Sequence, residues 1–285
     1  MRKVVKASIF FTILSFITAY YFYRQIAIFD PIRIQFRSII NSYYKEIPSI
    51  KKNLQCYETD KELSVLPKKT FRLITWNIHK GQDQGWQRDL QGFEKNSDFI
   101  LLQEATEQQN LSSFSEALSV SAFSYRGMQS GVTTLSRFPV NLYCAGSEKE
   151  PWILIPKVAN AIRLPLEKQD SLLIINLHLI NFEWYPESYL RQLNGLFSLV
   201  DRHQGPVILA GDFNSWNERR YQVLQKLIKQ YGFSEVSYEQ DVRLQFLDYP
   251  LDHVFTKGIK TLKATSVSLQ SSDHNPILLE FELYN

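Results

Sequence analysis

From Thr70 onward, short apolar runs of strand length alternate with segments of helical periodicity, which leaves few folds open to this chain. We expect strands at residues 71–76, 99–103, 131–136, 152–155, 172–179, 207–211, 252–256, 263–269 and 276–283. We expect helices at residues 86–95, 107–118, 187–202 and 217–231. This pattern predicts a mixed α/β domain over residues 70–285, in which two sheets pack together beneath outer helices.

The first residues have a different character. After a basic start, residues 7–23 are seventeen residues without a charge, which is the short end of a membrane-spanning helix. The bulky aromatic residues at positions 20–23 suit a membrane interface and do not suit a signal-peptide cleavage site. We therefore expect residues 1–29 to form an uncleaved transmembrane anchor, with a cleaved signal peptide as the alternative. Basic residues flank the segment on both sides, so its orientation stays open.

Residues 30–69 are expected to connect this anchor to the folded domain. Apolar residues such as Ile32, Phe36 and Ile39 recur at helical spacing among basic residues. This predicts an amphipathic helix over residues 31–52 that lies on a membrane or packs on the domain. Residues 53–69 have mixed charge and read as a linker.

Composition excludes several classes of site. The net charge of +3 is too small to predict nucleic-acid binding from bulk electrostatics. The two cysteines, Cys56 and Cys144, form no CxxC pair, which excludes a disulfide framework and a cysteine zinc site. A single disulfide remains open, but we expect two thiols.

Polar residues gather where the expected strands begin or end. The apolar run 207–210 leads directly into Asp212 and Asn214, which point the same way on an extended backbone. A turn that caps the next helix would explain this pair equally well. Four of the five histidines lie in similar clusters beside Asp, Glu or Asn, which is typical of a functional site. They are His79, His178, His253 and His274.

The ordered set of these motifs resembles the endonuclease/exonuclease/phosphatase superfamily, the fold of DNase I, AP endonucleases, neutral sphingomyelinases and inositol polyphosphate 5-phosphatases. The greatest likeness is to its bacterial YafD-like branch. The resemblance covers roughly residues 70–285 and implies a four-layer α/β/β/α sandwich, here preceded by the expected membrane helix. The motifs are TWNIHKG (75–81), LLQEA (101–105), GVTTLSRFPV (131–140), INLHL (175–179), LAGDFNSW (209–216), LDHVF (251–255) and SSDHNPILLEF (271–281).

The resemblance implies a phosphoesterase that uses Mg²⁺, or Mn²⁺ in its place. The substrate would be a phosphodiester or phosphomonoester, in either nucleic acid or a phospholipid or its head group. Together with the anchor, this predicts a single-pass protein of the bacterial inner membrane. The alternative is a non-catalytic scaffold that retains the fold, although the complete set of polar clusters argues against it.

By resemblance, three residues would serve the metal. Glu104 is the expected main ligand, Asn77 would bind the metal or orient Glu104, and Asp273 would be a second carboxylate. One or two carboxylates suffice for magnesium, which keeps several water ligands.

Five residues would carry the chemistry. Asp212 would position or deprotonate the attacking water, and Asn214 would donate to the phosphate as charge develops. His274 would face the phosphate, held by Asp252, because a carboxylate fixes the tautomer of an imidazole and favours its charged form. His178 would act at the phosphate or the leaving group.

The remaining polar residues are less specific. Asn176 shares a strand face with His178, and Arg137 lies in a turn, so both are candidates for substrate binding. A metal role for His79 is doubtful. His253 follows Asp252 and must face away from it on a strand, so we expect a structural role.

Overall fold

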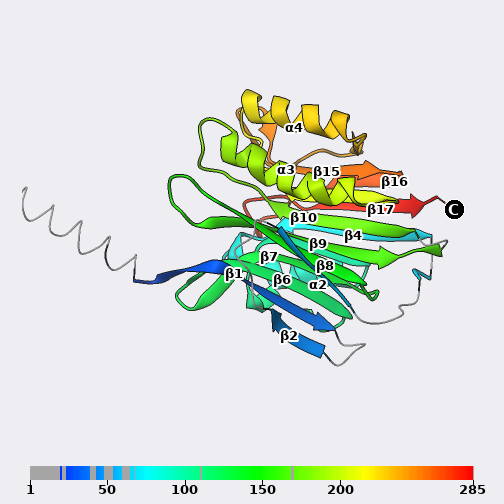
Figure 1. Ribbon diagram of the computed structural model, residues 1–285, viewed down its shortest axis with the longest axis horizontal. Coiled ribbons are helices and arrows are strands. Elements are labelled where there is room, and N and C mark those ends of the chain that lie inside the picture. The colour runs from blue at the N-terminus through cyan, green and yellow to red at the C-terminus, as the bar shows by residue number, and fades with distance from the viewer. Residues whose placement is uncertain are drawn as a thin grey trace, which may run out of the picture.

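The computed structural model describes residues 20, 24–38, 43–47 (backbone only), 54–59, 65–67, 69–109, 111–167 and 170–284. Within this part of the chain, two large β-sheets pack face to face, with helices on their outer faces (Figure 1). The predicted mixed α/β sandwich of two sheets is therefore confirmed. A third, two-stranded sheet is a small hairpin of β13 (Gln245–Phe246) and β14 (Tyr249–Pro250).

The first sheet has eight strands in the described chain. In spatial order they are β16 (Ile259–Ser266), β17 (Ile277–Leu283), β4 (Thr70–Asn77), β5 (Phe99–Ala105), β7 (Met128–Ser136), β6 (Glu116–Tyr125), β1 (Ile26–Ser38) and β2 (Tyr43–Ile47). The second sheet has seven described strands. They are β12 (Ser234–Glu235), β15 (Asp252–Lys257), β11 (Val207–Asp212), β10 (Ser171–His178), β9 (Pro156–Pro165), β8 (Leu142–Lys149) and β3 (Leu54–Glu58).

Alternating side chains divide the core into layers, because successive residues of a strand face opposite sides. In β10, Leu172 and Ile174 enter the core between the sheets, whereas Leu173 and Ile175 pack under α3 (Glu187–Asp201) and α4 (Glu218–Gln230). On the first sheet, α2 (Trp86–Glu94) covers the opposite outer face through Trp86. The single helix on one side and the pair on the other complete the four layers.

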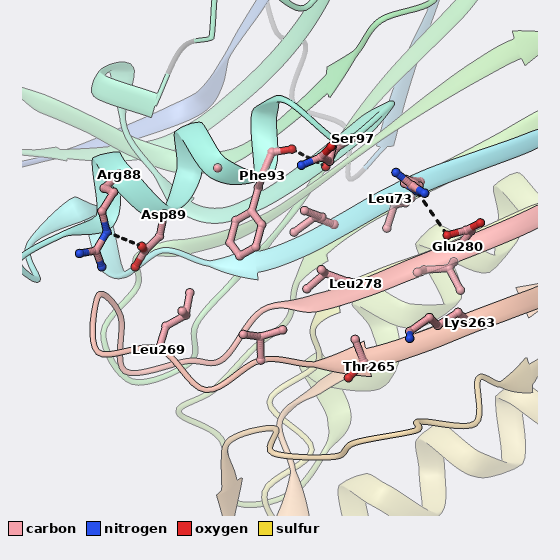
Figure 2. A pocket seen from close by; sticks show the side chains of 16 residues that line it. Leu73, Arg88, Asp89, Phe93, Ser97, Lys263, Thr265, Leu269, Leu278 and Glu280 are labelled. Atoms are coloured by element: carbon pink, nitrogen blue, oxygen red, sulfur yellow. Dashed lines mark hydrogen bonds and ion pairs between the residues drawn. The ribbon is translucent and has the colours of Figure 1, made fainter.

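Because α2 covers only part of its sheet face, a groove of about 540 Å³ remains between α2 and strands β4, β17 and β16 (Figure 2). Its floor is apolar, and two ion pairs lie at its rim. They join Arg88 Nε to Asp89 at 3.0 Å and Arg72 Nε to Glu280 at 3.3 Å. No histidine lines this groove, and it lies on the outer face of the sheet.

The topology collects certain strand ends at one edge of the sandwich. β4 runs parallel to β5, and β10 runs parallel to β11, so the carboxyl ends of each pair lie together. β15 and β17 run antiparallel to β11 and β4, so their first residues lie at the same edge. Asp212 is thereby paired in register with both His178 and Asp252.

Of the elements predicted from residue 70 onward, most are observed and two are wrong. In place of a helix at 107–118, a short 3₁₀ turn (Glu107–Gln109) precedes β6, in which Leu118, Val120 and Ala122 alternate into the core. Residues 152–155 form the connection between β8 and β9 and are not a strand.

The region before residue 70 also differs from expectation. The predicted amphipathic helix over 31–52 is wrong in its described part, because Ile32, Ile34 and Phe36 alternate into the core along β1. The apolar spacing of this stretch satisfied a period of two as well as the helical period. The described fold therefore begins before residue 70.

The predicted linker at 53–69 contains β3, which pairs with β8. Cys56 and Cys144 are directly opposite each other in this pair and form a disulfide, so the expectation of two thiols is wrong. No described helix is long and apolar enough to cross a bilayer. Of the predicted anchor, residues 1–29, the structure describes Tyr20 and residues 24–29, and the rest lies outside the described residues. Because β1 begins at Ile26, the prediction that the anchor extends to residue 29 is wrong.

Candidate active site

Asp212 lies at the centre of the edge of the sandwich where these strand ends meet. It is the last residue of β11, is only 2% exposed, and follows Gly211, where a Cβ atom would lie 2.1 Å from the carbonyl oxygen of Leu177. Only glycine allows β10 and β11 to approach this closely. Burial raises the pKa of Asp212 to about 6, although the nearby His274 favours its ionised form.

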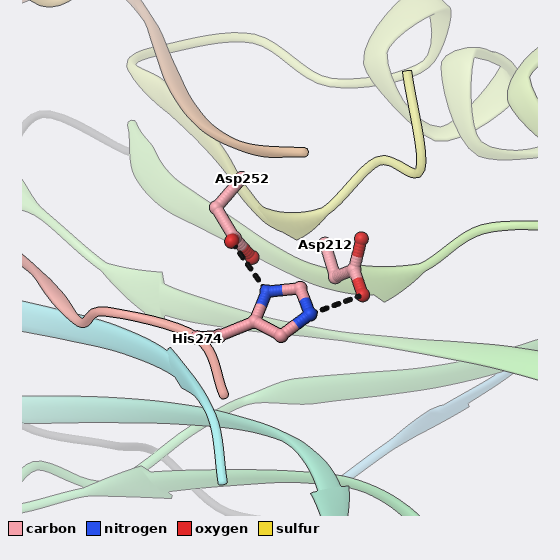
Figure 3. Close-up of side chains that lie close together, drawn as sticks. All are labelled: Asp212, Asp252 and His274. Carbon is pink, nitrogen blue, oxygen red and sulfur yellow. Dashed lines mark hydrogen bonds and ion pairs between the residues drawn. The ribbon is translucent and has the colours of Figure 1, made fainter. Parts of the chain in front are cut away.

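His274 reaches this carboxylate from the loop before β17 (Figure 3). Its Nδ1 lies 2.6 Å from Asp252 Oδ2, and its Nε2 lies 4.0 Å from Asp212 Oδ2. Burial alone would lower the pKa of His274, but the charge and hydrogen bond of Asp252 and the charge of Asp212 raise it to about 10. His274 is therefore an imidazolium at neutral pH, as the predicted pairing with Asp252 requires.

His178 approaches the same carboxylate oxygen from β10, with its Nε2 3.4 Å from Asp212 Oδ2. The Nζ atom of Lys157, at the start of β9, lies 2.7 Å from the same Nε2. Burial and the positive charge of Lys157 lower the pKa of His178 well below its usual value. His178 is therefore neutral, and a protonated Lys157 can only donate, so Nε2 accepts.

Glu104 enters the site through a β-bulge. The register of β5 against β7 shifts between Gln103 and Ala105, and Glu104 has a positive φ of 51°. A bulge re-aims a side chain that regular alternation would send to the outer face. Although burial opposes ionisation, the neighbouring imidazole of His178 and the ammonium groups of Lys80 and Lys157 lower the pKa of Glu104 to about 2. Lys80 forms an ion pair with its Oε2.

Two asparagines hold Asp212 in place. Asn77 Nδ2 donates to Asp212 Oδ2 at 3.0 Å, while its Oδ1 accepts from the backbone N–H of His79 at 3.2 Å. Asn77 therefore orients Asp212, and its role as a metal ligand or as an orienting partner of Glu104 stays a prediction. The backbone N–H of Asn214 donates to Asp212 Oδ1, and its Nδ2 donates to the carbonyl of Leu179, both at 2.9 Å. One amide proton of Asn214 remains for a substrate.

Asp273 and His79 lie on the solvent side of the site. The Asp273 side chain is 56% exposed and its Oδ1 is 3.8 Å from His79 Nδ1. The same nitrogen of His79 lies 2.7 Å from Asp83 Oδ2. Asp273 is thus accessible, whereas His79 is held by carboxylates on both sides. His253 is fully buried against Glu235, on the outer face of its sheet, as expected for a structural residue.

The donor set fits a divalent cation at Glu104 better than at the buried trio. Among the described residues, Asp212, Asp252 and His274 are the group whose ligand atoms all lie within 4.8 Å of one another. However, His274 Nδ1 is engaged by Asp252, and a charged imidazolium repels a cation. Glu104 is ionised and already accommodates one positive group, the ammonium of Lys80. A single such carboxylate with water ligands can hold magnesium.

Two predicted substrate contacts are wrong. The Asn176 side chain is fully buried between the sheets, where its Oδ1 accepts from Gln103 Nε2 at 2.7 Å and its Nδ2 donates to the carbonyls of Leu102 and Thr133. Arg137 follows the end of β7 that pairs with the start of β5, away from Glu104, and donates to the carbonyl of Ser97 at 2.7 Å. Both residues stabilise the fold.

The sequence pattern did not reveal the two lysines of the site. Lys157 lies on β9, a strand that was not predicted because Lys157, Asn160 and Arg163 interrupt its apolar residues. The alternation of Val158, Asn160 and Ile162 was the available signal. Lys80 follows His79 within a recognised motif, but nothing in the spacing indicated that it meets Glu104.

Comparison with known proteins decides the family. The profile described as "Endonuclease/Exonuclease/phosphatase family" matches residues 74–274. The chain belongs to the endonuclease/exonuclease/phosphatase family. A UPF0294 protein of Vibrio vulnificus is 36% identical over 241 residues, which cover 82% of this chain and 85% of that protein. The predicted YafD-like branch is thereby confirmed.

Solved structures of the family share the fold at low identity. A mannosyl-6-phosphatase from Bacteroides thetaiotaomicron has a TM-score of 0.55 at 14% identity, over 74% of this chain and 99% of that one. TDP2 of D. rerio, in complex with a single-strand DNA product, has a TM-score of 0.53 at 13% identity, over 75% and 100%. The family therefore includes proteins that act on different phosphate esters.

Proposed function

We propose that this protein hydrolyses a phosphate ester by attack of an activated water, with the help of a divalent metal ion. The observation that carries the proposal is the placement of buried Asp212 between a neutral imidazole and a positively charged one. His178 and His274 approach the same oxygen of Asp212, at 3.4 and 4.0 Å. A base beside a positively charged hydrogen-bond donor is the arrangement that water attack on a phosphate requires.

Asp212 is the proposed base. Its raised pKa of about 6 makes the carboxylate a better proton acceptor than an ordinary aspartate, yet keeps it ionised at neutral pH. The two asparagine contacts fix both of its oxygens, so the carboxylate cannot rotate away from a bound water.

His274 is the proposed stabiliser of the transition state. Its charge persists because Asp252 holds Nδ1, and its Nε2 proton points into the site. Charge accumulates on the phosphoryl oxygens during attack, so a fixed imidazolium stabilises the transition state more than the ground state. Neutral His178 and the remaining amide proton of Asn214 are the proposed partners of the leaving group and the phosphate.

The proposed metal ion is Mg²⁺ or Mn²⁺, held mainly by Glu104 with exposed Asp273 as a second carboxylate. When bound, the ion would neutralise phosphate charge and polarise the ester. We propose a phospholipid, its head group or nucleic acid as the substrate class, since the chemistry is common to all three. We also propose that the uncharged segment before β1, residues 7–23, anchors the catalytic domain to the inner membrane.

The test compares Asp212→Asn and His274→Ala with wild-type protein on bis-p-nitrophenyl phosphate and p-nitrophenyl phosphate, with magnesium and with EDTA. We expect each variant to lose roughly 10²–10⁴-fold in kcat, the size of a general acid–base contribution. His203→Gln is the matched control, because this histidine lies in the turn after α3, outside the site. Thermal unfolding should be similar for all proteins, and wild-type-like turnover by either variant contradicts the mechanism.

The metal role has its own variant. Glu104→Gln should raise the magnesium concentration needed for half-maximal rate, because the amide lacks the charge that holds the ion. Isothermal titration of magnesium into both proteins checks binding independently of turnover. Equal affinity would place the metal elsewhere.

A further inference from the structure

Three loops at the catalytic edge expose large apolar side chains. They are the β8–β9 connection, the β10–α3 connection and the β13–β14 hairpin. Six of their side chains are between 54% and 65% exposed, well beyond what a folded chain usually leaves in water in one region. These residues, here called the apolar rim, are Trp152, Leu154, Trp184, Tyr185, Phe246 and Leu247.

Contacts between the loops join the rim into one surface. Glu150, which is fully buried, accepts from the backbone N–H groups of Asn181 and Phe182 at 2.7 and 2.8 Å, and so ties the first loop to the second. The ring of Trp216 lies 6.1 Å from that of Trp184 and 6.1 Å from that of Phe246, which connects the second loop to the hairpin.

The rim surrounds the site. The second loop begins directly after His178, and the hairpin ends just before Asp252. Ile153 of the first loop helps to line a cavity of about 120 Å³ whose wall also contains Glu104, Lys157 and His178. Whatever contacts the rim therefore also lies over the catalytic opening.

The composition of the rim favours a lipid bilayer over a nucleic acid. Tryptophan and tyrosine prefer the membrane interface, and leucine prefers the acyl region. Nucleic acid would need free cations beside stacking aromatic rings. Two nearby cations are instead paired, Lys149 with Asp30 at 2.7 Å and Arg191 with Glu148 at 3.0 Å. A third, Arg219, lies over the ring of Tyr185 at 5.2 Å from its centroid, and one such contact does not make the basic groove that follows a nucleic-acid backbone.

The chain enters the described fold at the same end. β1 begins at Ile26, and its Asp30 pairs with Lys149 at the base of the first rim loop. Figure 1 shows the start of β1 and the long loops at one end of the molecule and the C-terminus at the other. In the sequence, the uncharged residues 7–23 come two residues before β1. The strand that follows this apolar segment therefore begins at the end of the molecule where the apolar rim lies.

We propose that the apolar rim seats in the interfacial region of a phospholipid bilayer, so that the catalytic opening faces the membrane surface. This docking proposal rests on the proposed function in one respect only: the phosphate ester that is hydrolysed would then belong to the bilayer. Docking itself needs no turnover, and the two statements can fail separately.

The experiment uses the full chain in vesicles of phosphatidylcholine, prepared with plain or with brominated acyl chains, which quench tryptophan fluorescence on contact. We expect bromine-dependent quenching, and we expect the double variant Trp152→Phe, Trp184→Phe to lose most of it. Tyr284→Trp is the matched control, because this exposed residue lies after β17, at the opposite end of the molecule. The emission that it adds should be insensitive to bromine.

Two results overturn the proposal. One is equal bromine quenching in wild type and double variant, which would assign the contact to other tryptophans. The other is quenching of the same two tryptophans by single-stranded DNA without any bromine effect, which would make the rim a nucleic-acid surface. Asp212→Asn should keep the quenching by brominated lipid while losing hydrolysis. If wild-type protein is quenched but hydrolyses no phosphate ester, the proposed function is refuted and the docking proposal stands.

Discussion

The two histidines that flank Asp212 show how neighbouring groups give the same type of side chain two different charge states within one site. On the His274 side, a carboxylate lies 2.6 Å from the imidazole and raises its pKa to about 10. On the His178 side, an ammonium lies 2.7 Å from the imidazole, and burial and this charge lower its pKa far below the usual value. Both histidines are buried to the same extent, so the neighbouring charge decides whether the pKa is raised or lowered.

This contrast assigns different tasks to the two halves. A permanently charged imidazole can only donate, whereas a neutral one can accept or donate. The buried carboxylate between them is attracted by the charged imidazole of His274 on one side and by the more distant ammonium of Lys157, beyond neutral His178, on the other. The catalytic edge therefore has a positive charge at Lys157 on the His178 side of Asp212 and a negative charge at Asp252 behind His274.

The largest disruption of this contrast should come from Asp252→Asn. The amide keeps the shape of the side chain but removes the charge that sustains the imidazolium, so burial should then lower the pKa of His274. We expect kcat to fall roughly 10²–10⁴-fold at pH 8, similar to removal of an acid–base group. NMR titration of the imidazole should show the shift, and an unchanged pKa would refute the role of Asp252.

The pH dependence of wild-type turnover should depend on the ionisation of both Asp212 and His274. Asp212 must be ionised, so the rate should fall as the pH drops through about 6. His274 must be protonated, so the rate should fall as the pH rises through about 10. Beyond each limit the decline should be about tenfold per pH unit. A profile of kcat/KM that stays flat from pH 5 to 8 would contradict the assignment of Asp212.

Substitutions around His178 should lower turnover less than substitutions around His274. Lys157→Met removes the ammonium and should raise the pKa of His178, because one cause of its depression is gone. We expect a loss of roughly tenfold in kcat, which corresponds to about 1.4 kcal/mol. Lys260→Met, an exposed lysine that is paired with Glu282 on the edge strand, is the control. A fall in kcat as large as that of Asp252→Asn would show that the surroundings of His178 and His274 matter equally for turnover.

The smallest effect on activity should come from Glu116, a buried carboxyl at the opposite end of β6 from the site. Burial raises its pKa to about 7, and Ser38 Oγ donates to it at 2.8 Å. A raised folded-state pKa means that its contribution to stability is complete below pH 4.5 and disappears as the pH rises through 7. Glu116→Gln should therefore increase stability at pH 8 by on the order of 1–3 kcal/mol.

Denaturant unfolding at pH 5 and pH 8 measures this effect. The gain should be absent at the lower pH, and kcat should be unchanged. Equal stability of the two proteins at pH 8 would show that Glu116 is not shifted.

The sequence predicted the parts of this arrangement that depend on strand ends. Strand ends located Asp212, Asp252 and His274 separately, the resemblance to the family implied that they act together, and the structure brings them within contact. The same reasoning failed for Asn176. Its strand face was correctly expected to match that of His178, but strand parity does not tell how deep along the strand the solvent reaches.

Other misses have different physical causes. Lys157 and Glu104 meet through a missed strand and a bulge, and neither is visible in periodicity. β1 was missed because its short apolar spacing satisfied two periods, and only pairing with β6 resolves the choice. Long-range pairing of this kind cannot be read from local sequence.

The disulfide between Cys56 and Cys144 gives the fold a dependence on redox conditions. It attaches the edge strand β3 to β8 by a covalent bond and closes a loop of 88 residues. Cross-linking a loop of this length reduces the entropy of the unfolded chain by an amount worth ~4–5 kcal/mol. In a reducing environment, β3 would be held to β8 by noncovalent contacts alone, so reduction of this bond should lower the stability of the sandwich.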